Sequence, residues 1–136
     1  MRLPDIIRLA LVAIFALGAL ANITMALFTP SVYETFADMA FFSVYTDLWQ
    51  DLVYPNIRLF LVPVILLELT IAWLLLQSRA YVKIGLLVAL LFDLFLVPFW
   101  WQGVAISNLV LALPLAWLLR FHYPLTIPAI LAGGGS

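Results

Sequence analysis

Four stretches of this chain are apolar over about the length that a helix needs to cross a lipid bilayer. A spanning helix requires about 20 mainly apolar residues, because each residue advances the helix by only about 1.5 Å through about 30 Å of hydrocarbon. The predicted spans are roughly 5–28, 56–77, 81–101 and 104–121. We therefore expect an all-α integral membrane protein, an antiparallel bundle of four transmembrane helices that forms one domain over residues 1–132. Residues 133–136, Gly-Gly-Gly-Ser, are typical of a linker.

The composition supports the membrane class and excludes several functions. Apolar residues make up 67% of the chain and charged residues 10%, whereas a soluble domain carries about 25% charged residues. The six basic residues and the net charge of −1 argue against nucleic-acid binding, which needs a concentrated basic surface. With no cysteine and one histidine, His122, we expect neither disulfides nor a bound metal.

The basic residues predict the orientation. With an even number of spans, five of them would share one side of the bilayer, and the positive-inside rule makes that side the cytoplasm. The other side would receive the four acidic residues of the connection 31–54. We expect both termini in the cytoplasm and the protein in the inner membrane of the cell. The five basic residues are Arg2, Arg8, Arg79, Lys83 and Arg120.

The beginning of the chain also has features of a secretory signal. Arg2 and Arg8 flank the start of an apolar run, and 19–21 (Ala-Leu-Ala) fits a cleavage site. The run continues to Phe28, beyond the length of a signal core, so we expect an uncleaved helix.

The connection at 31–54 is too long for a simple turn between two spans. From Ser43 to Leu52, polar and apolar residues separate onto opposite faces of a helix, which predicts an amphipathic segment at the outer membrane interface or capping the bundle. A second short helix is expected within 31–42. The alternative interpretation is a lid over a cavity that opens toward the outer leaflet.

Two acidic residues interrupt the apolar spans. Glu68 lies in the second span and Asp93 in the third, and the turn between these spans centres between Arg79 and Ala80. The two carboxyls therefore lie at similar height near mid-membrane. Placing a charged acid there costs about 2.5–3.5 kcal/mol on insertion scales, so without a nearby cation they should not both ionise.

Small residues could bring these two acids together. Ala72 follows Glu68 by four residues and Ala89 precedes Asp93 by four, so each alanine shares a helix face with an acid. Small residues allow membrane helices to approach closely. Rotation of either helix would separate the acids, so their contact stays open.

Further side chains complete a candidate site within the membrane. The polar groups could form a network that fixes helix register, a ligand or proton site, or a contact with a partner protein or water. Glu68 and Asp93 are also the candidate catalytic residues. The candidate ligand-binding residues are Glu68, Asp93, Asn22, Asn108 and Trp73.

Several short motifs are spaced along the chain. Arg8 is followed by 17–22 (Leu-Gly-Ala-Leu-Ala-Asn), then by 66–68 (Leu-Leu-Glu), and a basic turn at Arg79 leads into Gly85. This pattern resembles the DoxX-like family of small four-helix bacterial membrane proteins, although the connection between the first two spans is longer here. The resemblance implies a link to membrane redox systems and a quinone as a possible ligand. The placement of acidic residues among aromatic ones within a membrane bundle is also similar to that in the emopamil-binding, sterol-isomerase-like group. This second resemblance is one of chemistry alone.

Three hypotheses for function follow. The leading one is an accessory or ligand-binding membrane module that holds a quinone-like molecule, alone, as a homo-oligomer or with a membrane-protein partner. The second is an enzyme in which the pair Glu68 and Asp93 transfers a proton on a lipid-soluble substrate. The third is a proton-coupled transporter.

Overall fold

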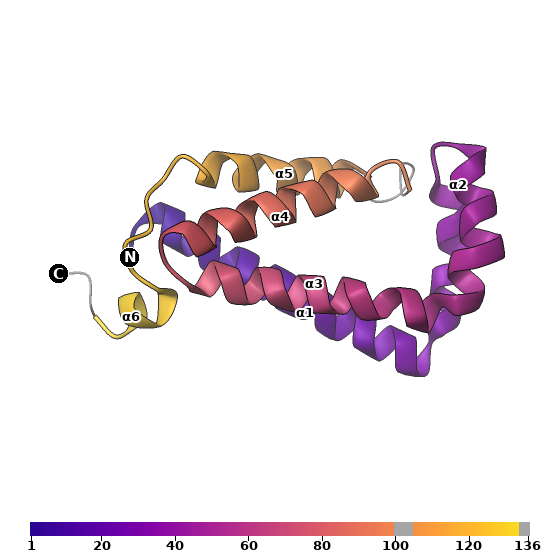
Figure 1. Ribbon diagram of the computed structural model, residues 1–136, viewed down its shortest axis with the longest axis horizontal. Coiled ribbons are helices and arrows are strands. Elements are labelled where there is room, and N and C mark those ends of the chain that lie inside the picture. Colours follow the sequence, from indigo (N-terminus) through magenta and orange to yellow (C-terminus); the bar gives the residue numbers. More distant parts are fainter. Residues whose placement is uncertain (100–104, 134–136) are drawn as a thin grey trace.

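The computed structural model describes residues 1–99 and 105–133, and within these ranges the chain is helical and contains no β-strand. Figure 1 shows the four longest helices side by side, with successive ones running in opposite directions. The most extensive contact is between α1 and α3, and α4 packs between α3 and α5. These helices are α1 (Leu3–Phe28), α3 (Ile57–Leu76), α4 (Ala80–Leu96) and α5 (Ala105–Leu118), and a short α6 (Ile127–Leu131) follows.

The connection between α1 and α3 is helical, as predicted, and its apolar side chains are only partly covered by the rest of the protein. Trp49 and Val53 are buried, whereas Val44, Leu48 and Leu52 of the predicted apolar face are exposed. The connection lies across the end of the bundle where α1 ends and α3 begins (Figure 1). It consists of the 3₁₀ helix η1 (Pro30–Met39), α2 (Ser43–Leu48), the π-helical η2 (Trp49–Val53) and the 3₁₀ turn η3 (Tyr54–Asn56).

Two helical stretches, Leu3–Phe28 and Ser43–Leu76, are long and apolar enough to cross a membrane. The second exceeds its predicted length because η2 and η3 join α2 to α3 without a break. α4 has 17 residues and ends at Leu96, short of the predicted 101, because Pro98 has no backbone N–H with which to continue the helical hydrogen bonds. α5 has 14 residues. The predicted span ends at 101 and 104 lie outside the described residues.

The interior contains two separate apolar clusters. The first lies toward the α3–α4 turn, where Phe15 of α1, Leu75 of α3 and Leu86 of α4 are buried together. The second lies at the opposite end, where Ala26, Ile57 and Leu61 pack against the connection. Between these clusters, each long helix carries polar residues on its buried side.

The α3–α4 contact is tightest near its turn. A Cβ atom on Gly85 would lie 2.8 Å from the Cβ of Leu74, so only glycine fits without moving the helices. Ala72 and Ala89, predicted to form the seam, are both buried in the first cluster.

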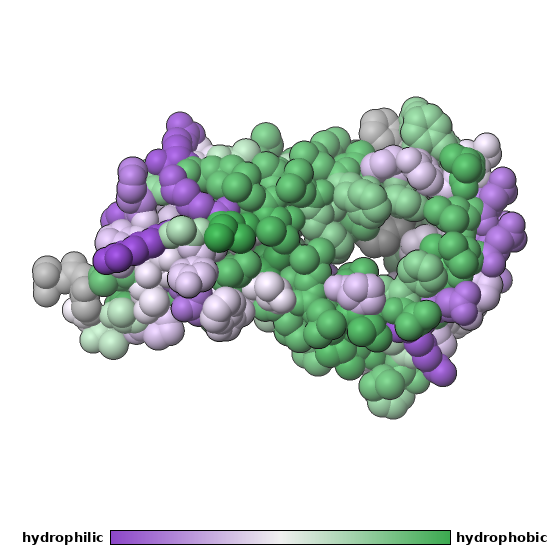
Figure 2. All heavy atoms as spheres, in the orientation of Figure 1, coloured by the Kyte–Doolittle hydropathy of each residue, from purple (hydrophilic) through white to green (hydrophobic). Residues whose placement is uncertain are grey.

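The molecule is polar at its two ends and apolar in between, as Figure 2 shows along the long axis. We call the end with the α3–α4 turn and the N-terminus the basic end, and the end with the connection 30–56 the acidic end. Arg79 and Lys83 lie at the first, and the four acidic residues between 34 and 51 at the second.

A buried ion pair lies at the basic end. Asp5 and Arg8 are 2% and 0% exposed, and Arg8 Nη1 lies 3.7 Å from Asp5 Oδ1. The Nε of Arg2 donates to Asp5 Oδ2 at 2.9 Å, and Arg8 Nη2 donates to the carbonyl oxygen of Leu125 at 3.3 Å. The Arg8 guanidinium also lies 5.0 Å from the centre of the Tyr123 ring. The pair thereby anchors the first turns of α1 to the segment after α5.

Candidate functional site

Four polar side chains, one from each long helix, lie between the two apolar clusters. We call Asn22, Glu68, Asp93 and Asn108 the polar layer. Glu68, Asp93 and Asn108 are 9%, 4% and 8% exposed, and Asn22 is half-buried. Asp93 lies three residues before the end of α4 and Asn108 three residues after the start of α5, so antiparallel packing gives them similar height. The structure thus places four of the five predicted ligand-binding residues at one level.

Glu68 belongs to a chain of hydrogen bonds that reaches the acidic end. Asn22 Nδ2 donates to Glu68 Oε2 at 3.0 Å, and the Tyr33 hydroxyl donates to Asn22 Oδ1 at 2.6 Å. The Trp49 Nε1 in turn donates to the carbonyl oxygen of Tyr33 at 2.8 Å. Burial, and then the charge of Glu68, raise the pKa of Tyr33 to about 12, so its hydroxyl remains a donor at physiological pH. The connection is thereby fastened to α1 and α3.

Gly18 makes room for the Glu68 carboxyl. A Cβ atom on Gly18 would lie 2.9 Å from Glu68 Oε1. Gly18 precedes Asn22 by one helical turn, so both residues lie on the face of α1 that meets α3. Gly18 leaves space for the Glu68 carboxyl, and the side-chain amide of Asn22 donates a hydrogen bond to it. Together they position the carboxyl between α1 and α3.

Asp93 and Asn108 form the contrasting half of the polar layer. Asp93 Oδ2 and Asn108 Nδ2 are both buried, and neither has a hydrogen-bond partner in the described chain. Buried polar atoms are paired in the great majority of cases, because an unpaired one costs about 1–3 kcal/mol. Asn22 and Glu68 therefore have hydrogen-bond partners within the protein, whereas Asp93 Oδ2 and Asn108 Nδ2 have none in the described residues.

Glu68 and Asp93 share no hydrogen bond within the described residues. Each faces the interior of the bundle at the predicted height, but Glu68 is engaged with α1. The two acids therefore occupy different surroundings, and a shared proton between them has no support in this geometry.

Trp73 lies apart from the polar layer. Its side chain is 55% exposed, and its ring packs edge-on against Tyr81 with the ring centres 6.4 Å apart. Trp73 therefore lies on the surface of α3, away from the four side chains of the polar layer.

Tyr33 belongs to the hydrogen-bond chain of Glu68 but was not among the residues predicted from the sequence. It is 2% exposed and is the only link in the described chain between Asn22 and the connection. In the sequence it lies in the short helix expected within 31–42, where no local signal distinguishes it from other interfacial tyrosines.

An apolar groove runs along the flank of α3 and α4. Its volume is about 480 Å³. Two of its lining residues, Leu67 and Phe92, directly precede Glu68 and Asp93 in the sequence. The groove is therefore at the same height as the polar layer, on a neighbouring face of each helix. The complete lining is Pro63, Val64, Leu67, Val88, Leu91, Phe92 and Phe95.

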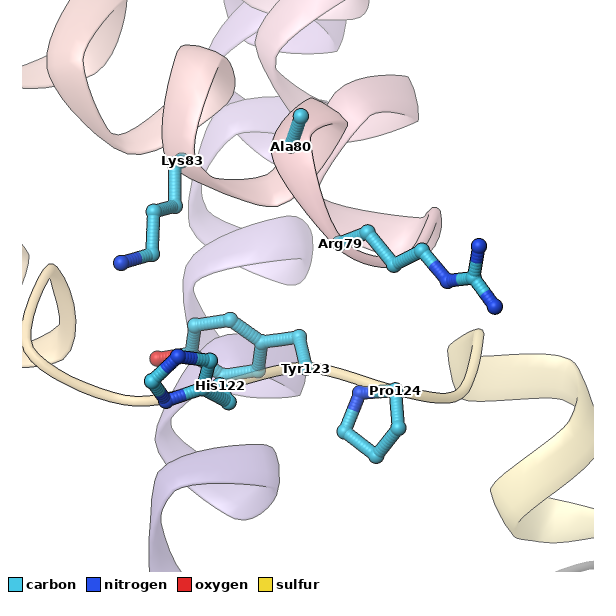
Figure 3. A pocket seen from close by; sticks show the side chains of 6 residues that line it. All are labelled: Arg79, Ala80, Lys83, His122, Tyr123 and Pro124. Carbon is cyan, nitrogen blue, oxygen red and sulfur yellow. The ribbon is translucent and has the colours of Figure 1, made fainter.

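A second pocket, of about 470 Å³, lies at the basic end. Arg79 there has a φ of 56°, unusual for a residue with a side chain, and its backbone N–H donates to the carbonyl oxygen of Tyr123 at 2.6 Å. In Figure 3, Lys83 extends toward His122 while Arg79 extends to the opposite side. The basic groups therefore do not converge on one point.

No group of three metal-ligating side chains occurs in residues 1–99 and 105–133. Comparisons with protein-family models, with curated proteins and with solved structures found no match.

Proposed function

We propose that this chain is a four-span membrane protein whose polar layer binds the head group of a lipophilic, quinone-like molecule. The observation that carries this proposal is the position of the layer, in which four polar side chains separate two apolar clusters. Ligand sites of this kind are largely apolar and contain a few placed polar groups. The resemblance to the DoxX-like family supports a quinone as the first ligand to test.

The apolar middle and the charged ends support the membrane arrangement. Two stretches meet the length and composition of a span, and α4 and α5 lie alongside them in opposite directions (Figure 1). Four spans would place the basic end in the cytoplasm. In that arrangement the groove of α3 and α4 faces lipid, which gives an apolar tail a path and a place to lie.

A binding role is better supported than catalysis by paired acids. Proton transfer between Glu68 and Asp93 needs them within reach of one substrate group, whereas Glu68 is held by Asn22. An accessory role in a larger membrane complex is compatible with a binding module.

Native mass spectrometry of the purified protein, followed by extraction of bound molecules, tests this proposal. We expect the wild type to retain a specific lipophilic molecule that is lost from Glu68→Gln or from Asp93→Leu. Thr70→Val is the matched control, because Thr70 is an exposed polar residue of α3 whose hydroxyl donates to the carbonyl oxygen of Leu66. If all four proteins carry only the same bulk lipid, the proposal is wrong.

A further inference from the structure

The unpaired half of the polar layer has the chemistry of a head-group site. Asp93 Oδ2 and Asn108 Nδ2 are buried on neighbouring helices at similar height and have no partner in the described residues. We propose that Asp93 and Asn108 hold a hydroxyl group on the head of the lipophilic ligand, such as the hydroxyl of a quinol, the reduced form of a quinone. This inference rests on the proposed function and assigns the ligand's hydrogen-bonding group and its two residues.

A hydroxyl has the hydrogen-bonding chemistry to pair with both atoms at once. The amide Nδ2 of Asn108 can only donate, and Oδ2 of Asp93 can accept. A hydroxyl oxygen accepts from the first while its hydrogen is donated to the second. An ether oxygen would accept from Asn108 but leave Asp93 unpaired. An ammonium group would pair with Asp93 but offers no acceptor to Asn108.

Glu68 is the poorer candidate for the head group. One of its carboxyl oxygens already accepts from Asn22, and Gly18 packs against the other. The Tyr33 hydroxyl in turn bonds Asn22. A ligand at Glu68 would have to displace these protein contacts, whereas at Asp93 it would displace none that the structure records.

The groove provides the tail with a place to lie at the level of this site. Phe92 lines the groove and Asp93 is the next residue of α4. A ligand whose tail lies between Leu67 and Phe92 would have its head next to the turn of α4 that carries Asp93.

A matched pair of probes isolates the hydroxyl. Tritiated 4-decylphenol and its methyl ether, 1-decyl-4-methoxybenzene, share a ring and a tail, but only the phenol can donate a hydrogen bond. Equilibrium dialysis against the protein in detergent micelles, with empty micelles as the baseline, measures the preference for the phenol. Losing one such hydrogen bond to a carboxyl corresponds to about tenfold in affinity. We expect the wild type to prefer the phenol by about tenfold.

The variants assign the preference to its residues. We expect it to disappear in Asp93→Leu and in Asn108→Leu, and to persist in Asp93→Asn, because an amide can also accept from the hydroxyl. If the preference for the phenol persists in Asp93→Asn, its loss in Asp93→Leu reflects loss of the hydrogen-bond acceptor and not unfolding of the protein. Thr70→Val should match the wild type.

Three results would overturn the inference. Equal binding of phenol and ether by the wild type would show that the site does not select a hydroxyl. Tighter binding of 4-decylbenzylamine than of the phenol would show that Asp93 selects a cation. A preference lost in Glu68→Gln but kept in Asp93→Leu would move the head group to Glu68 and leave the proposed function standing.

Discussion

Replacing Asp5 by leucine is expected to lower the free energy of unfolding by about 3–5 kcal/mol, the largest loss among the single substitutions considered for this chain. The change removes the acid beside Arg8, whose side chain is fully buried. Arg8 would keep its bond to the Leu125 carbonyl and its contact with the Tyr123 ring, but neither supplies a negative charge. Unfolding in mixed micelles with a rising fraction of denaturing detergent measures the loss.

The double variant Asp5→Leu/Arg8→Met distinguishes the cost of leaving the Arg8 charge buried without a partner from the cost of altered packing. Removing both charges should restore most of the stability, because an apolar pair of similar volume often replaces a buried ion pair at little cost. Glu34→Leu is the control for loss of an exposed acid and should change stability by less than about 0.5 kcal/mol. A single variant as stable as the double variant would contradict the assigned role of Asp5.

Asn22→Leu should cost about 2–4 kcal/mol, because it leaves two buried groups without partners. The Tyr33 hydroxyl loses its acceptor and Glu68 Oε2 loses its donor. Each buried unpaired group costs about 1–3 kcal/mol. The same micelle titration measures the loss of stability. In a background that keeps Trp49 and replaces the other four tryptophans by phenylalanine, quenching of fluorescence reports whether Trp49 becomes exposed as the connection loosens.

Thr24→Val provides the matched comparison on α1. Thr24 is exposed, and its hydroxyl donates only to the Leu20 carbonyl of its own helix. Its replacement should change stability by less than about 0.5 kcal/mol. If Asn22→Leu is no more destabilising than Thr24→Val, the chain from Glu68 to Trp49 does not stabilise the fold.

Much of the helical layout could be predicted, because long apolar runs and their breaks are local features. The first helix was predicted at 5–28 and runs from Leu3 to Phe28; the second was predicted at 56–77 and runs from Ile57 to Leu76. The early end of α4 also has a local cause in Pro98. Helical periodicity also predicts an apolar face in the connection, but not that Trp49 of this face is buried while Val44 and Leu48 are exposed.

The candidate site was predictable in its depth but not in its pairing. Counting from a hairpin turn places Glu68 and Asp93 at equal height, yet the rotation of each helix decides its partner. That rotation depends on packing between α1 and α3, where Gly18 admits the Glu68 carboxyl. Tyr33 was missed because its role arises from a tertiary contact with Asn22. Asp5 and Arg8 are three residues apart on one helix, but the burial of the pair depends on the segment after α5.

The most direct test of the central claim, that the polar layer is a ligand site, is the thermal unfolding of Asp93→Leu/Asn108→Leu with and without 4-decylphenol. Leucine at both positions removes the two buried, unpaired polar groups and keeps a side chain of similar size, so the cost of leaving them unpaired disappears. Without the phenol, the variant should therefore melt at or above the temperature of the wild type. The phenol should raise the melting temperature of the wild type alone, because only a binding site links ligand to stability. A variant that melts lower than the wild type, with both proteins responding equally to the phenol, would show that these residues stabilise the fold and do not bind the ligand.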